Sequence, residues 1–280
     1  MAAIAEVLSP ADLRHFVEHG WVVAKGVIDA EQAQRTAHEV WTFAELDPAD
    51  ENSWYEADGT TLRRINSAMY HGQAQWENRT APRIHGAFSQ IWETERLWTS
   101  HDSVNVNPPT REPAAANDLH WDCDLRLWTL AEAKAARPIV GDVQGVLYLA
   151  DTPAENGAFI CVPGFQHKLD DWLDTLPAGT DNLRQAFSEQ YPGGGADALR
   201  IGAAAGDLVI WDTRLPHSRS VIRSLTPASP ASSSAAAVLA TTTCHSILDC
   251  AGLTYYSIYM TQASPHSVAY PTHEQQSARG

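Results

Sequence analysis

His120 and Asp122 stand two positions apart in a segment, Leu119–Leu127, whose residues favour a β-strand. Side chains two residues apart on a strand point to the same face, so this imidazole and this carboxylate are expected to converge on one point. His217 is the candidate for a third group, because it follows the strand-like run 206–212 and a turn. Two histidines and one carboxylate form a facial triad, which binds iron(II) and leaves coordination positions open for a co-substrate and oxygen.

The His-x-Asp motif alone is a weak signal. With 12 histidines, a chain of this length is expected to contain roughly one such triplet by chance. Its context strengthens the signal, because the sequence holds a single His-x-Asp triplet and that triplet lies in a strand-like segment. A third histidine follows a second strand-like segment about ninety residues later. We therefore predict a metal site, with catalytic function, at His120, Asp122 and His217.

Composition excludes several classes of partner. Lys and Arg total 19 against 34 Asp and Glu, a formal net charge of -15, so the protein's field repels polyphosphates and anionic lipid surfaces. The apolar runs are far shorter than the roughly 18–20 residues that span a bilayer. We therefore expect a small-molecule substrate and neither a nucleic-acid nor a membrane partner.

Cysteine usage and the N-terminal residues indicate the compartment. The four cysteines show no Cys-x-x-Cys pair or other zinc-type spacing. The first residues do not resemble a charged and then apolar signal peptide. Both observations favour an intracellular protein with reduced thiols, and we expect a cytoplasmic location.

The N-terminal part, residues 1–98, combines helix and strand signals. A capping serine and a first-turn proline predict a helix over 9–19, and an N-capping aspartate predicts a second helix over 29–44. Between them, β-branched and aromatic residues predict a strand over 20–28. Apolar residues then recur at helical intervals, which predicts a shared buried face formed by Trp76, Ile84, Phe88 and Trp92.

Beyond residue 98, short strand-like runs between Gly and Pro turns are typical of β-sandwiches and barrels. The candidate strands are Thr99–Val106, Leu119–Leu127, Val143–Ala150, Ala158–Val162 and Asp207–Asp212. Within this core, 99–262, we expect a helical insertion over 168–190 and, from its uncharged Ser, Ala and Thr content, an irregular segment over 224–243. A polar tail follows over 263–280. The prediction is one domain over 1–280, mainly β with flanking helices.

Six segments, in order along the chain, carry a resemblance to a known family. They are Phe16–Val23, Trp98–Pro109, Leu119–Asp122, Val143–Pro153, Gly157–Gly164 and Gly206–His217. Together they resemble the phytanoyl-CoA dioxygenase family of iron(II)/2-oxoglutarate-dependent oxygenases, particularly its secondary-metabolism branch. The resemblance implies a double-stranded β-helix, also called a jelly roll or cupin-like barrel.

The resemblance also implies a chemistry. Iron(II) would be bound by His120, Asp122 and His217, with 2-oxoglutarate as co-substrate and O2 as oxidant. The reaction would oxidise a C–H bond of a small organic substrate and release succinate and CO2. Since the carboxylate of Asp122 is present, the site resembles a hydroxylase type rather than the halogenases in which a small residue replaces that ligand.

The sequence departs from the family at the residue that holds 2-oxoglutarate. Members use an arginine about ten residues beyond the third ligand, because its fork of donors pairs with the distal carboxylate. That position falls here in Thr226–Pro230, which contains no arginine. Either Arg223 or Arg219 acts from a displaced backbone, or this clamp is missing. The strand that usually carries it is alternatively displaced to Thr254–Met260.

Three more residues are candidates for binding the co-substrate or the substrate. Gln144, Ser103 and Asn105 lie on expected strands that can face the barrel interior, where amides and hydroxyls form hydrogen bonds to a ligand. The alternative for each is an ordinary barrel-lining role. We expect Arg214 to pair with a neighbouring carboxylate such as Asp212.

Two other readings stay open. A non-catalytic or 2-oxoglutarate-independent metal-binding barrel of the same fold is motivated by the unusual segment 224–243. A cupin-like metal isomerase or lyase shares the barrel, but it usually draws more histidines into the site. A homodimer is expected only by analogy with the family, and the sequence does not identify the substrate.

Overall fold

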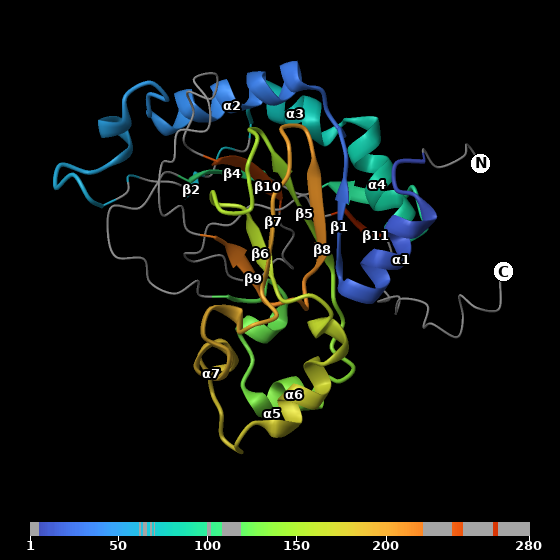
Figure 1. The fold of residues 1–280 in the computed structure, drawn as a ribbon. Coiled ribbons are helices and arrows are strands. Elements are labelled where there is room, and N and C mark those ends of the chain that lie inside the picture. The colour runs from blue at the N-terminus through green and yellow to red at the C-terminus, as the bar shows by residue number, and fades with distance from the viewer. Residues whose placement is uncertain are drawn as a thin grey trace.

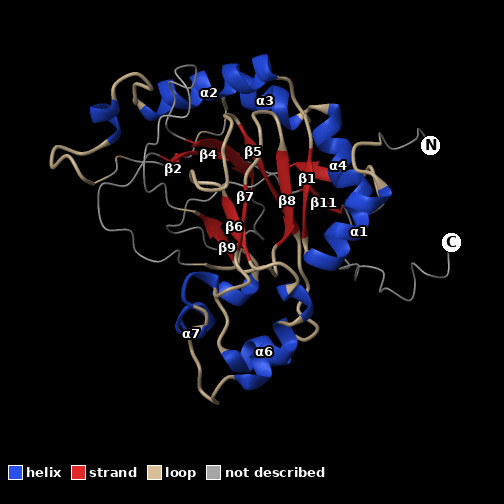
Figure 2. Cartoon of the chain, in the orientation of Figure 1, coloured by secondary structure: helices blue, strands red, loops and turns tan. Residues whose placement is uncertain are grey.

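The computed structural model describes most of the chain. The described residues are 6–61, 63, 66–67, 69, 71–99, 102–107, 119–220, 237–242 and 260–262. Their strands lie in the middle of the molecule, with one group of helices above and beside them and a second group below (Figure 1). Figure 2 shows the same arrangement as red strands between two sets of blue helices. Within these residues, no helix is both long enough and apolar enough to span a membrane.

The strands form a large sheet, a small sheet and a short ribbon, and all pairings are antiparallel. The large sheet has the order β1 (Trp21–Ala24), β8 (Leu208–Asp212), β5 (Val143–Tyr148), β10 (Ala237–Thr242), β4 (Asp102–Asn107) and β2 (Asn66–Ser67). The small sheet has the order β7 (Leu199–Ile201), β6 (Phe159–Cys161) and β9 (His217–Arg219). The ribbon pairs β11 (Met260–Gln262) with β3 (Leu97–Thr99).

The large sheet separates two apolar cores. Side chains alternate along a strand, and in β8 Leu208 packs with the N-terminal helices, whereas Val209 packs in the core between the two sheets. Tyr148 connects the sheets, because its hydroxyl donates to the carbonyl of Ile201 at 2.8 Å and accepts from the N–H of Phe159 at 2.8 Å. The predicted jelly-roll barrel with flanking helices is therefore confirmed.

Four helices cover the outer core on the N-terminal side (Figure 1). They are α1 (Pro10–His19), α2 (Ala30–Ala44), α3 (Gln73–Arg79) and α4 (Pro82–Trp92). Ser9 and Asp12 form a capping box, in which each side chain accepts a hydrogen bond from the other residue's backbone N–H. Asp29 caps α2 by accepting from the N–H of Gln32. The two helices predicted before residue 45 are thus confirmed, together with the caps that start them.

The predicted buried face of residues 73–98 is only partly right. Ile84 and Phe88 of α4 are fully buried, as expected. Trp76 of α3 is 48% exposed, so its assignment to that face is wrong. The face of α3 that packs on α2 is polar, since the amide of Gln32 donates to the side chain of Asn78 at 2.8 Å. This hydrogen bond helps to fix the rotation of α3 about its axis, and the side chain of Trp76 is left exposed to solvent.

A second group of helices lies below the barrel (Figure 2). It comprises α5 (Leu130–Ala135), α6 (Leu169–Thr175) and α7 (Leu183–Gln190), so the expected insertion over 168–190 contains two helices. Their aromatic residues surround Trp121, whose ring centroid lies 6.1 Å from Phe165, 5.4 Å from Trp172 and 5.2 Å from Phe187. The indole N–H of Trp121 donates to the carbonyl of Arg214 at 2.9 Å. Trp121 is therefore a core residue, and it anchors the backbone between His120 and Asp122.

The segment Leu119–Leu127 is not the strand that its composition predicts. Only His120 makes an isolated β-bridge, and the chain then turns into the short 3-10 helix η2. The carbonyls of Cys123 and Asp124 accept hydrogen bonds from N–H groups three residues later, which satisfies this backbone locally instead of across a ladder. The other 3-10 helices are η1 (Glu51–Trp54), η3 (Phe165–His167) and η4 (Pro192–Gly194), and η2 is Asp124–Arg126.

The prediction of an irregular segment over 224–243 is wrong for Ala237–Thr242. These residues form β10, which lies inside the large sheet between β4 and β5. Strand pairing on both sides supplies the hydrogen bonds that fix the extended backbone, and the local composition gives no sign of those partners. Residues 224–236 and 243 lie outside the described residues.

Replacing Phe187 with Ala tests whether the helices below the barrel support the metal-binding segment. The Phe187 ring is buried among Trp121, Phe165 and Trp172, so its loss is expected to lower the free energy of unfolding by about 3–5 kcal/mol. Phe43→Ala is the matched control, because Phe43 is 51% exposed and its loss should change stability by at most about 0.5 kcal/mol. Denaturant unfolding measures both; equal effects would contradict the assigned packing.

Candidate metal centre

The backbone of the barrel brings His120 and His217 face to face. Each residue's N–H donates to the other's carbonyl at 2.9 Å, which forms an isolated antiparallel bridge. Residues paired in this way point their side chains to the same face of the sheet. Their ring centroids lie 4.8 Å apart. The bridge extends the small sheet by one residue, because His217 belongs to β9 and also pairs with Cys161 of β6.

Asp122 completes the cluster. One carboxylate oxygen, Oδ1, lies 3.6 Å from Nε2 of His120, and the other, Oδ2, lies 3.4 Å from Nε2 of His217. One ligand atom from each of the three residues lies within 4.8 Å of the other two. The three side chains are almost completely buried. In the part of the chain that the structure describes, this is the one group of three or more such residues that is able to hold a metal ion.

Neighbouring groups orient these side chains. Nδ1 of His217 donates to the carbonyl of Leu215 at 2.9 Å, which turns Nε2 toward Asp122. The amide of Gln144, on β5, donates to Oδ2 of Asp122 at 2.9 Å. Gln144 is fully buried. The sequence predicts that Gln144 binds the co-substrate or substrate or lines the barrel; in the structure its amide contacts the carboxylate of the cluster.

Charge favours a cation at this point. Burial by itself would raise the pKa of Asp122, but a hydrogen bond with His217 and the charges of both imidazoles outweigh it and hold the pKa below its ordinary value. The group is therefore a carboxylate throughout the neutral range. Two imidazole nitrogens and an ionised carboxylate, withdrawn from water, form a donor set suited to a divalent transition metal.

The two described cysteines near the cluster are unsuited to bind the metal. Burial raises the pKa of Cys123 to about 12, and burial raises the pKa of Cys161 further still. Burial thus favours the neutral thiol in the metal-free protein, and neither sulfur belongs to the group of side chains placed to hold a metal ion. Cys161, although directly opposite His217 in the sheet, is part of the apolar interior.

Two aromatic rings contact the imidazole of His217. The Phe159 ring is stacked on its imidazole with centroids 5.8 Å apart, and the Trp211 ring lies 5.0 Å from it. Phe159 and Trp211 are themselves 4.4 Å apart. Sequence reasoning did not single out either residue. The available signal was strand alternation, which places both on the inward faces of β6 and β8, but it does not identify which inward residues reach the cluster.

The other site residues predicted from the sequence are not members of the cluster formed by His120, Asp122 and His217. Asn105 is buried on β4, and Ser103 is on the same strand, although its side chain is not described. Arg219 is the last residue of β9, two positions beyond His217. Arg223 lies outside the described residues. Arg214 makes the expected ion pair with Asp212, at 2.6 Å.

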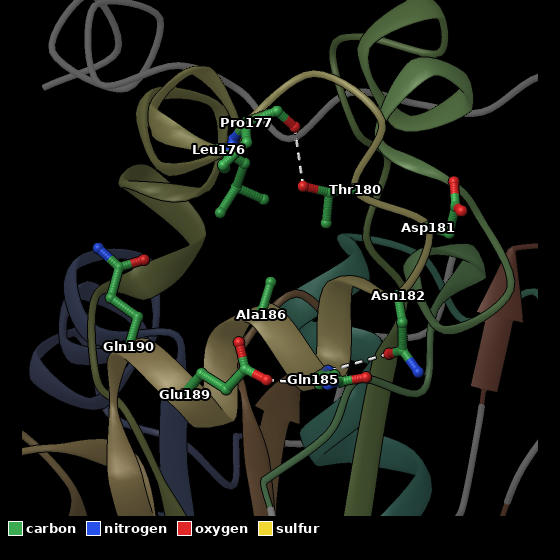
Figure 3. Close-up of a pocket in the computed structure, with 9 residues that line it drawn as sticks. All are labelled: Leu176, Pro177, Thr180, Asp181, Asn182, Gln185, Ala186, Glu189 and Gln190. Atoms are coloured by element: carbon green, nitrogen blue, oxygen red, sulfur yellow. Dashed lines mark hydrogen bonds between the residues drawn. The ribbon is translucent and has the colours of Figure 1, made fainter.

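A groove of about 550 Å³ lies apart from the metal cluster, on the insertion that carries α6 and α7 (Figure 3). Its lining comes from a single stretch of the chain and includes no member of the cluster. The lining residues are Leu176, Pro177, Thr180, Asp181, Asn182, Gln185, Ala186, Glu189 and Gln190. Because most of these polar groups are exposed to solvent, the groove lacks the buried, converging groups of a reaction centre.

Comparison with known proteins agrees with this architecture. The chain is 23% identical, over 72% of its length and 69% of the relative, to Ava biosynthesis cluster protein O of Aspergillus versicolor. Its fold is similar to that of the epimerase SnoN, crystallised with Fe3+, alpha ketoglutarate and nogalamycin RO; the TM-score is 0.55 and the identity 17%, over 91% of this chain and 85% of that one.

A second solved structure gives the same fold. The alpha ketoglutarate dependent carbocyclase SnoK from nogalamycin biosynthesis matches with a TM-score of 0.56 and 15% identity, over 92% of this chain and 86% of that one. The sequence profile of the phytanoyl-CoA dioxygenase family matches residues 16–225, which hold the whole metal cluster. This match covers most of the chain and confirms the resemblance seen in its motifs: the chain belongs to the phytanoyl-CoA dioxygenase family.

Proposed function

We propose that this protein is an iron(II)- and 2-oxoglutarate-dependent dioxygenase that oxidises a C–H bond of a small organic substrate, with succinate and CO2 as co-products. The convergence of His120, Asp122 and His217 carries the proposal. Family membership supports it, as do two proteins of similar fold, an epimerase crystallised with alpha ketoglutarate and an alpha ketoglutarate dependent carbocyclase.

The three residues fit a bound iron(II) ion. Two ligands at right angles, each about 2.1 Å from a first-row metal, are roughly 3 Å apart. The separations of 3.4 and 3.6 Å between the carboxylate oxygens and the imidazole nitrogens are close to this value. All three groups come from one side, the bridge between residues 120 and 217, so they would occupy one face of the coordination sphere.

Each protein group then has a defined task. Leu215 holds His217 in the tautomer that presents Nε2, and Gln144 holds the carboxylate of Asp122. The rings of Phe159 and Trp211 exclude water behind His217. Iron(II) bound here together with a 2-oxo acid would allow O2, the oxidant, to attack a C–H bond while the 2-oxo acid is converted to succinate and CO2.

Arg219 is the arginine that we propose for the distal carboxylate of 2-oxoglutarate. It lies two residues beyond His217 on β9, so both side chains extend from the same face of that strand. In the ladder it is paired with Phe159, whose ring contacts His217. A guanidinium at this position can form paired hydrogen bonds with a carboxylate. Arg223, the other candidate from sequence, is tested by the same experiment.

The substrate is proposed to be a small molecule of secondary metabolism. One relative belongs to a biosynthesis cluster by name, and the two structures of similar fold are an epimerase and a carbocyclase. Hydroxylation and such related oxidations both begin with attack on a C–H bond. The alternative of a barrel that does not use 2-oxoglutarate loses part of its motivation, since Ala237–Thr242 is a strand of the sheet.

Removing any one ligand is expected to abolish high-affinity iron(II) binding. The variants are His120→Ala, Asp122→Ala and His217→Ala, and the measurement is anaerobic titration of metal-free protein with iron(II), followed by 2-oxoglutarate. Wild type should develop the weak visible charge-transfer band of a chelated 2-oxo acid, and the variants should not. His167→Ala is the control, because His167 is exposed and its Nε2 forms a hydrogen bond with the carbonyl of Val17. Wild-type iron binding in a ligand variant would refute the assignment.

Gln144→Met tests the group that holds Asp122. Methionine has a similar length but no donor, so the carboxylate loses its 2.9 Å hydrogen bond. Loss of such a supporting contact is expected to weaken iron(II) binding by about 10–100-fold. Gln185→Met, on the exposed surface of α7, should leave the affinity unchanged. An unaltered dissociation constant in Gln144→Met would show that the hydrogen bond does not support the metal.

Arg219→Gln tests the proposed carboxylate clamp. Loss of a paired, charge-assisted contact is expected to weaken 2-oxoglutarate binding by about 30–100-fold without changing iron(II) affinity. The matched control is Arg200→Gln, since Arg200 is exposed on the neighbouring part of the small sheet. Anaerobic titration with 2-oxoglutarate measures both variants. Wild-type affinity in Arg219→Gln would direct the search to Arg223.

A further inference from the structure

Trp211 places a buried hydrogen-bond donor beside the metal cluster. The residue is only 2% exposed, and its indole N–H has no acceptor among the described residues. A buried donor that gives up water without gaining a partner destabilises the fold. Such groups are rare in folded proteins and call for a specific explanation. A bound molecule with an acceptor atom at this point would supply the missing partner.

The position of Trp211 limits the kinds of molecule that are able to accept this hydrogen bond. On β8 it is paired with Gln144 of β5, the residue that holds Asp122. Its ring lies 5.0 Å from that of His217 and 4.4 Å from that of Phe159. The indole therefore borders the space next to the proposed iron, on the side where Phe159 and His217 meet.

Arg219 approaches the same region from the small sheet. It is the partner of Phe159 in the ladder between β6 and β9, whereas Trp211 contacts the Phe159 ring from the large sheet. Arg219 and Trp211, each with N–H donors in its side chain, are thus neighbours of Phe159 from opposite sheets. Donors of this kind suit an anionic oxygen, because hydrogen bonds to a charged acceptor are the strong ones.

We propose that the indole N–H of Trp211 donates a hydrogen bond to the distal carboxylate of the 2-oxo acid, as a second donor beside Arg219. This inference rests on the proposed function and adds a selectivity determinant to it. The methylene groups of the co-substrate pack against Phe159, and the two donors require a carboxylate at the far end. A 2-oxo acid that ends in a methyl group offers no acceptor to the indole N–H, so the site selects 2-oxo diacids.

The test compares two acids that differ only at that end. 2-Oxoglutarate carries the distal carboxylate, and 2-oxopentanoate has a methyl group in its place. Both are titrated anaerobically into wild-type and Trp211→Phe protein loaded with iron(II). Loss of the N–H is expected to raise the dissociation constant of 2-oxoglutarate about tenfold and to leave that of 2-oxopentanoate unchanged.

Trp21→Phe is the matched control. Trp21 is opposite Trp211 in the sheet and its indole N–H also lacks an acceptor among the described residues, but it is on the edge strand β1 and its ring contacts His15 instead of His217. Its replacement should change neither dissociation constant. Iron(II) affinity and thermal unfolding are measured on all proteins, so that damage to the metal site or the fold is separated from loss of the donor.

Two outcomes would overturn the proposal. If Trp211→Phe weakens both acids equally, the N–H serves the end of the acid that both share. If it weakens neither, the N–H donates to water or to the substrate. Failure of the proposed function gives a different result, because wild-type protein would then bind iron(II) but no 2-oxoglutarate.

Discussion

The pair of backbone hydrogen bonds between His120 and His217 is the interaction on which this site depends. Each bond measures 2.9 Å, and together they fix two residues from distant parts of the chain in one orientation. Since the side chains of such a pair share a face, both imidazoles are presented together without any direct contact being needed to align them. Asp122 follows His120 by two residues, so the bridge also fixes its position approximately. The hydrogen bond from Gln144 then orients the carboxylate of Asp122.

The rest of the architecture supports that bridge from two sides. Below it, Trp121 separates the two ligands in sequence and is held in an aromatic cluster contributed by the helical insertion. Above it, inward residues of β5, β6 and β8 supply Gln144, Phe159 and Trp211. The residues next to the cluster are therefore two aromatic rings and one amide, and the amide donates to the carboxylate of Asp122.

Many features of this protein are determined by residues that are close together in the sequence. The helix caps at Ser9 and Asp29, the alternation of β5 and β8, and the ion pair of Arg214 with Asp212 involve residues that are close together in the chain or follow a simple period. The ligand types were also recognisable, because chemistry restricts which side chains bind a metal. The family motifs added the expected barrel, and the match over residues 16–225 agrees with them.

Tertiary structure decided the rest, because the partner of an extended or half-buried segment is chosen by residues far along the chain. Residues 119–127 favour a strand by composition but find one pairing partner, at His217, whereas Ala237–Thr242 finds a strand on each side. The exposure of Trp76 follows from hydrogen bonds between α2 and α3. The sequence by itself determined which side chains are chemically able to bind iron. The pairing of distant strands determined that three of these side chains meet, and that Gln144 and Trp211 lie beside them.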